Sequence, residues 1–125
     1  MTFTIPCTGD VVAGDIIEFT EAVFAGTFRR PRYVGERTVQ AEVLRDSYGA
    51  GKQQHTFTLK VLASAGAEPL AAGTVTTRKG RNVYRNGTRR AAWAVEANRR
   101  AALDEKHTRG DLARAVRAER VGGFQ

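Results

Sequence analysis

The stretch TVQAEVL, from Thr38 to Leu44, alternates polar and apolar side chains, with Val39, Ala41 and Val43 on one face. The stretch HTFTLKV, from His55 to Val61, repeats the same pattern. Alternation with a period of two is typical of a strand that buries one face only. The two stretches therefore predict neighbouring antiparallel strands. The glycine-containing segment from Asp46 to Gln53 is expected to join them as a hairpin loop.

A further β-rich stretch precedes this pair. Asp15 to Phe19 follows a glycine turn, and Ala22 to Phe24 continues it after a bend. The run VAGDIIEF, from Val12 to Phe19, resembles the first strand of small SH3-like and PUA-like barrels. That resemblance concerns architecture and implies no family and no function.

A basic hairpin is predicted at residues 74–85. Its two strands would turn at Lys79 and Gly80, because a glycine supplies the positive φ angle that a tight turn needs. Residues 1–87 are thus expected to form a small antiparallel β-barrel or coiled sheet, SH3-like or PUA-like in architecture. Closure of the sheet would protect its edges.

The pattern changes in residues 88–121, where alanine, arginine, glutamate and leucine dominate and favour helix. Trp93, Ala97 and Ala101 would fall on one narrow apolar line of such a helix. Gly110 predicts a break before a second short helical stretch. We expect a basic C-terminal helical segment that packs on the β domain or extends from it, which makes the fold class α+β.

The charge of the chain is strongly uneven along its length. The formal net charge is +7. Residues 1–77 contain seven lysines and arginines against eight acidic residues, whereas residues 78–125 contain thirteen against five. Such asymmetry indicates an anionic partner, most often nucleic acid.

Two groups of residues are candidates for contact with nucleic acid. Arginine forks bind phosphate oxygens and stack on bases, and a tyrosine ring can stack on an unpaired base. The first group lies in the predicted hairpin and the start of the helix and contains Arg78, Lys79, Arg81, Tyr84, Arg85, Arg89 and Arg90. The second is a loop patch between aromatic residues and contains Arg29, Arg30 and Arg32. Core packing is the alternative role for the tyrosine.

The sequence shows no recognisable catalytic motif, and we expect no enzymatic activity, metal or cofactor. Cys7 is the single cysteine, so neither an internal disulfide nor a zinc site with paired cysteines can form. The two histidines, His55 and His107, lie far apart in the sequence and make a poor metal site. Four clustered acids are expected on the solvent face of the first long strand: Asp10, Asp15, Glu18 and Glu21.

The leading hypothesis is a small basic protein that binds nucleic acid without catalysis and contacts mainly phosphates through the hairpin and the helix. DNA and RNA are equally compatible with the sequence. The alternative is a protein-interaction module, an inhibitor or accessory factor that docks on an acidic protein, for example of a mobile genetic element. A homodimer through the C-terminal helix would fit that alternative. The lack of a membrane-spanning run and of a signal peptide predicts a cytoplasmic protein.

Overall fold

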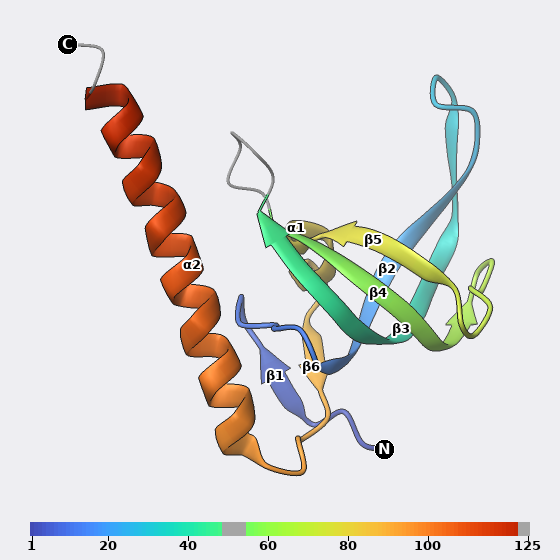
Figure 1. Ribbon diagram of the computed structural model, residues 1–125. Helices are drawn as coiled ribbons and strands as arrows, with labels where there is room; N and C mark the ends of the chain where they lie inside the picture. Colours follow the sequence, from blue (N-terminus) through green and yellow to red (C-terminus); the bar gives the residue numbers. More distant parts are fainter. Residues whose placement is uncertain (49–54, 123–125) are drawn as a thin grey trace.

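The computed structural model of the chain describes residues 1–48 and 55–122 (Figure 1). Its elements in chain order are β1 (Ile5–Cys7), β2 (Ile16–Gly26), β3 (Pro31–Tyr48), β4 (His55–Gly66), β5 (Val75–Lys79), α1 (Gly80–Tyr84), β6 (Thr88–Arg90) and α2 (Glu96–Gly122). The strands form one antiparallel sheet in the order β1-β6-β2-β3-β4-β5. The α+β class predicted from the sequence is confirmed.

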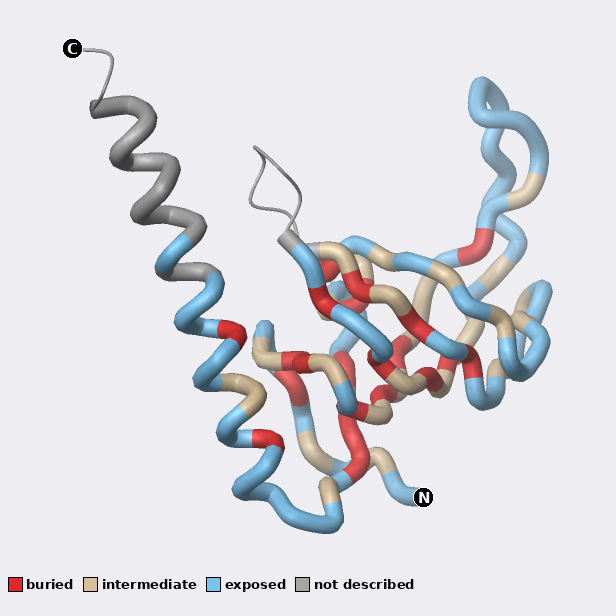
Figure 2. Tube along the Cα trace, viewed as in Figure 1, coloured by how far each residue is buried: buried red, intermediate tan, exposed pale blue. Residues whose placement is uncertain are grey.

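The two alternating stretches form the centre of the sheet, as predicted. β3 pairs with β4 from Arg37 opposite Gly66 to Tyr48 opposite His55. Their apolar faces are buried and supply most of the core, which contains Cys7, Val11, Ile17, Phe19, Val39, Ala41, Val43, Phe57, Leu59, Val61 and Val83 (Figure 2). Residues 49–53 of the predicted hairpin loop lie outside the described residues.

The sheet is coiled but does not close into a barrel, so that part of the prediction is wrong. One edge consists of β1, which has three residues, and the other of β5, which has five. Helix α1 contacts β2, β4 and β5, and its Val83 belongs to the core of the sheet. A helix in this position covers apolar surface that closure would otherwise have to bury. The SH3-like or PUA-like architecture stays a prediction.

The basic hairpin predicted at residues 74–85 is not formed. β5 ends at Lys79, and the chain then turns directly into α1. Gly80 is buried and begins the helix, where it has no positive φ angle. The helical turn places Val83 in the core with no exposed surface. Burial of a valine side chain contributes about 1.5–3 kcal/mol, which a solvent-exposed hairpin would forfeit.

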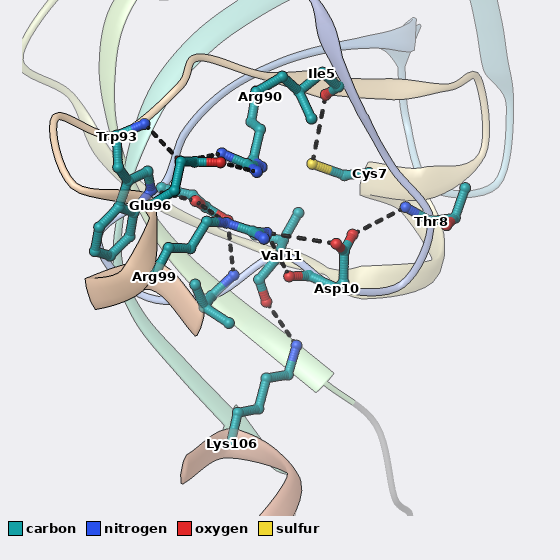
Figure 3. A network of polar contacts seen from close by, with 12 residues as sticks. Ile5, Cys7, Thr8, Asp10, Val11, Arg90, Trp93, Glu96, Arg99 and Lys106 are labelled. Atoms are coloured by element: carbon teal, nitrogen blue, oxygen red, sulfur yellow. Dashed lines mark hydrogen bonds and ion pairs between the residues drawn. The ribbon is translucent and has the colours of Figure 1, made fainter. Parts of the chain in front are cut away.

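Helix α2 docks on the domain through charged side chains (Figure 3). The carboxylate of Asp15, which has no exposed surface, accepts hydrogen bonds from Arg99 Nε at 2.8 Å and Nη2 at 3.0 Å. It also accepts from the indole Nε1 of Trp93 at 2.7 Å and from the amide of Val12 at 3.0 Å. Gly14 has a φ of +97°, and a side chain there would meet the Trp93 ring at 2.9 Å. We call Asp15, Trp93 and Arg99, together with Lys106, the docking network.

Lys106 makes the second buried contact of the helix. Its Nζ donates a hydrogen bond to the Val11 carbonyl oxygen at 2.6 Å and lies 5.4 Å from the centre of the Phe57 ring. One turn farther along, Arg109 forms an ion pair with Asp46 at 3.1 Å. Burial lowers the pKa of Lys106. The contact face of the helix is therefore cationic rather than apolar.

Two predictions for the C-terminal segment are wrong. Trp93 precedes the helix, and Ala97 and Ala101 are exposed to solvent instead of forming a packing line. The helix also continues through position 110 without a break. Asp15, predicted to lie on the solvent face, is the most deeply buried acid among the described residues, because it receives the cations of the helix. Among the described residues no helix has both the length and the apolar character to cross a membrane.

We expect Arg99→Ala to lower the free energy of unfolding by about 3–5 kcal/mol, because it leaves the Asp15 carboxylate buried without its main partner. Chemical denaturation followed by circular dichroism measures this change. Arg100→Ala is the matched control, since Arg100 is exposed and, among the described residues, forms an ion pair with Asp104 alone, on the same helix at 3.6 Å. The control should change stability by less than about 0.5 kcal/mol. Equal effects of the two substitutions would contradict this account of α2 docking.

Candidate nucleic-acid interface

The most prominent projection of the sheet is a two-stranded arm formed by residues 22–36 (Figure 1). β2 and β3 stay paired out to Gly26 opposite Pro31. β4 ends at Gly66, which lies opposite Arg37. Within the described part of the chain, residues 31–36 therefore have β2 as their sole strand neighbour. A two-stranded ribbon is thin enough to enter a nucleic-acid groove or to lie along a single strand.

The tip of the arm presents one aromatic and two basic side chains. Gly26 has a φ of +91°, and a side chain there would meet the Arg30 carbonyl oxygen at 2.6 Å. The Arg30 amide donates to both the carbonyl and the hydroxyl oxygen of Thr27, each at 3.1 Å. This tight turn leaves Phe28 fully exposed, with Arg29 and Arg30 exposed beside it.

Farther down the arm the same combination of cation and aromatic ring recurs. A register shift between Val23 and Phe24 interrupts the pairing of the two strands. The rings of Phe24 and Tyr33 pack edge to face with centres 5.8 Å apart, and each residue keeps more than half of its surface exposed. Arg32 is also exposed. Among the described residues, none of the three arginines of the arm forms a side-chain ion pair.

A cleft of about 290 Å³ lies at the base of the arm, between β2, β5 and α1. Its apolar wall consists of Phe19, Ala22 and Phe24. Its polar wall consists of Glu21, Arg78, Asn82, Arg85 and Asn86. Phe24 belongs to both the arm and the cleft, so the two form one continuous surface.

The polar wall of the cleft carries net positive charge. Arg78 Nε donates to both carboxylate oxygens of Glu21, at 2.9 and 3.2 Å, and its Nη1 donates to two threonine oxygens of β5 at 2.8 Å. Arg37 Nη2 lies 3.5 Å from the same carboxylate. Arg85 is exposed and has no ion pair with another described residue. Two guanidinium groups, those of Arg78 and Arg37, thus share the Glu21 carboxylate, and Arg85 adds a positive charge that no described acid neutralises.

Other predicted contact residues lie around this surface. Lys79 and Arg81 are exposed where β5 meets α1, next in sequence to Arg78 and Asn82 of the cleft. Neither has an ion pair with another described residue. Arg89 is exposed on β6, opposite Glu18 of β2 in the sheet.

Tyr84 and Arg90 are instead held by internal contacts. The hydroxyl oxygen of Tyr84 accepts a hydrogen bond from the Val11 amide at 2.9 Å, and its ring meets Phe57 edge to face. Burial raises the pKa of Tyr84, which keeps the phenol neutral. Arg90 is buried and donates two hydrogen bonds to Glu96, at 2.8 and 3.1 Å. The contacts of Tyr84 are those of core packing, the alternative role named for it. Neither Tyr84 nor Arg90 is therefore part of the candidate interface.

Six residues of the cleft were missed by the sequence reasoning: Phe19, Glu21, Ala22, Phe24, Asn82 and Asn86. Asn82 lies in α1, whereas Asn86 follows the end of that helix. No signal marked these two residues, because residues 82–85 were interpreted as a strand. The signal for Phe24 was an aromatic residue at the end of an alternating run, which leaves it on the outer face.

Comparison with known proteins places the chain in a family. Residues 7–93 match the family model described as "Domain of unknown function (DUF7699)". The chain belongs to the DUF7699 family. The matched part of this DUF7699 chain contains the arm, the cleft and α1, and it ends before α2 begins.

The DUF7699 chain is also similar to a much longer plant protein. It is 38% identical over 125 residues to "Zinc finger CCCH domain-containing protein 62" of Oryza sativa subsp. japonica. The match covers 96% of this chain but 18% of the relative, so the chain spans less than a fifth of that protein's length. Because the match covers nearly the whole chain, it includes most of α2. No solved structure matches the chain.

The zinc ligands implied by the relative's name are not present in the DUF7699 chain. A CCCH site needs three cysteines and one histidine, and this sequence has one cysteine. Among the described residues, no group of three or more histidine, cysteine, aspartate or glutamate side chains is placed to hold a metal ion. Burial raises the pKa of Cys7 to about 12, which disfavours the thiolate that a metal would require.

The contact between Arg90 and Glu96 predicts a specific pH dependence. The hydrogen bonds from Arg90 and from the Trp93 amide lower the pKa of Glu96 from its usual 4.5 to about 2. Because the pKa of Glu96 is lower in the folded state, the ionised carboxylate stabilises the fold fully above pH 4.5. This stabilisation is lost as the pH falls toward 2. We expect Glu96→Gln to flatten the stability curve in that window, measured by urea denaturation at several pH values. An unchanged acid limb in the variant would contradict the assignment.

Proposed function

We propose that this DUF7699 domain is a non-enzymatic nucleic-acid-binding module that contacts mainly phosphates. The observation that carries the proposal is the arm, where Arg29, Arg30 and Arg32 have no ion pair with another described residue. Phe24 connects the surface of the arm to the cationic cleft, which it also lines. Arginine forks match phosphate oxygens, and exposed aromatic rings between them offer stacking surfaces for bases.

The arm replaces the C-terminal region as the centre of the proposed interface. The excess of basic residues after position 77 pointed to that region, but several of these cations satisfy internal partners. Arg78 binds Glu21, Arg90 binds Glu96, Arg99 binds Asp15, Lys106 binds a carbonyl oxygen and Arg109 binds Asp46. A cation already paired in the fold gains less from a phosphate, because it must give up or share its partner. The unpaired cations of the arm have no such cost.

The comparison supports the proposal in a general way. The relative's name records a CCCH zinc finger, and the match with this chain covers 18% of that protein's length. A phosphate-binding module beside a zinc finger is compatible with joint action on one nucleic acid. Linked modules raise the effective concentration of the second contact without new interactions.

The alternative from the sequence, a module that docks on an acidic protein, would use the same unpaired cations. The two functions differ in the ligand that competes for the surface. Polyglutamate presents carboxylates at flexible spacing, whereas a nucleic acid presents phosphates together with bases. Release of a bound oligonucleotide by polyglutamate at equal charge concentration would favour the alternative.

We expect binding of the full chain to an oligonucleotide to weaken steeply with salt. Each phosphate neutralised contributes about 0.7–0.9 to the slope of log K against log salt concentration, so about five engaged cations predict a loss of roughly two orders of magnitude between 50 and 200 mM salt. Arg29→Ala combined with Arg30→Ala should lower the slope by about 1.4–1.8. Fluorescence anisotropy titrations at several salt concentrations measure both values.

Arg45→Ala combined with Lys60→Ala is the control that removes the same charge elsewhere. Both residues are exposed on the central strands, and neither has an ion pair with another described residue. This variant should keep the slope of the original chain within about 0.5. Equal loss in the two variants would mean that net charge, not the arm, causes binding. Absence of salt-dependent binding to any DNA or RNA would refute the function itself.

A further inference from the structure

We infer that the cleft at the base of the arm accepts one unpaired nucleobase, so that the preferred ligand is single-stranded. The inference rests on the proposed function and adds a substrate class to it. Its basis is a concave site that combines aromatic rings, amide groups and positive charge beside the phosphate-binding arm. Each of these properties is visible in separate contacts of the described residues.

The size of the cleft limits what it can hold. Its volume of about 290 Å³ lies at the lower end of the range for small-molecule sites, which begins at about 300 Å³. A single planar base is the part of a nucleic acid that fits such a space. A base pair within a duplex could not enter, because its partner strand would have to enter as well. A duplex would thus have to extrude the base at a cost of a few kcal/mol.

The apolar wall offers a surface for stacking. Phe24 keeps 59% of its surface exposed at the rim, whereas Phe19 is buried below it. Tyr33 packs edge to face against Phe24 and restrains its ring. Exposed aromatic rings are the usual stacking partners of unpaired bases, because every base has a π face.

The polar wall offers hydrogen bonds that the fold does not use. Asn86 Nδ2 donates to the Thr20 carbonyl oxygen at 3.0 Å, which leaves its Oδ1 as an acceptor directed by a fixed amide. Asn82 is half-buried and has no side-chain hydrogen bond to another described residue. An amide presents a donor and an acceptor side by side, the pattern that the edge of an unpaired base requires.

The charges around the cleft place the phosphates on both sides of the base. Arg78 is held by Glu21 and fixes the position of the wall, whereas Arg85 is exposed at the rim. The arginines of the arm continue the positive charge on one side, and Lys79 and Arg81 continue it beyond α1. A strand that crosses from the arm to α1 would therefore pass over the cleft with a phosphate on each side of the inserted base.

The test compares two strands with the same phosphates. The full chain is titrated with a fluorescent single-stranded oligonucleotide and with an abasic strand of equal length, at one salt concentration. The strand with bases should bind roughly ten-fold more tightly, since stacking of one base contributes about 1–3 kcal/mol. A duplex of the same sequence should bind no better than the abasic strand. Equal binding of the two single strands would overturn the inference while leaving the phosphate-binding function intact.

Variants locate the effect in the cleft. Phe24→Leu should reduce the advantage of the strand with bases by roughly five-fold or more, and Asn82→Ala by roughly two- to ten-fold. Phe28→Leu, at the exposed tip of the arm, is the aromatic control and should keep the advantage. If Phe28→Leu alone abolished the tighter binding of the strand with bases, stacking would belong to the tip of the arm, and the inference about the cleft would be wrong. Thermal melting of each variant shows that the fold is retained.

A free mononucleotide is the remaining competitor for such a cleft. It has the same base but lacks the flanking phosphates that the arm would bind. We expect millimolar nucleoside monophosphates to release little of the bound strand, because the strand also engages the arm. Release at micromolar concentration would mean that the cleft is a nucleotide site in its own right, which contradicts a strand-binding role.

Discussion

The buried carboxylate of Asp15 joins three separate segments of the chain. It has no exposed surface, and it accepts hydrogen bonds from Arg99, Trp93 and the Val12 amide. A buried charge without such partners would cost several kcal/mol, so all of them must be in place together. They come from the turn before β2, the segment after β6 and the helix α2. The carboxylate thus makes α2 a part of the sheet domain instead of an appended tail.

This arrangement also decides which cations remain available to a partner. In α2, Arg99 and Lys106 form buried contacts and Arg109 pairs with Asp46. In β6, Arg90 pairs with Glu96. The available cations are those that the fold places away from acids, above all on the arm. Net charge along the sequence therefore does not indicate which cations the fold leaves without an acidic partner.

The sequence predicted the centre of the fold well and some of the residues of the candidate interface. The alternation in residues 38–44 and 55–61 is a local property, and it predicted β3 and β4 with the correct inner faces. The hairpin at 74–85 was wrong because a glycine after a lysine resembles a turn, while the burial of Val83 that favours α1 depends on distant strands. The same limit applies to Asp15, whose partner Arg99 lies far away in the sequence. The arm was identified only as a basic patch between aromatics, since its projection depends on where β4 ends.

The place where the family match ends has a practical meaning for this fold. The match stops at residue 93, whereas Arg99 and Lys106 lie beyond it in α2. A fragment that ends at that boundary would keep all six strands of the sheet. It would lack Arg99, however, and would leave the Asp15 carboxylate buried without its main partner. The smallest unit that can be grafted into another polypeptide, whether by recombination or by cloning, therefore has to carry about the first three turns of α2 with it.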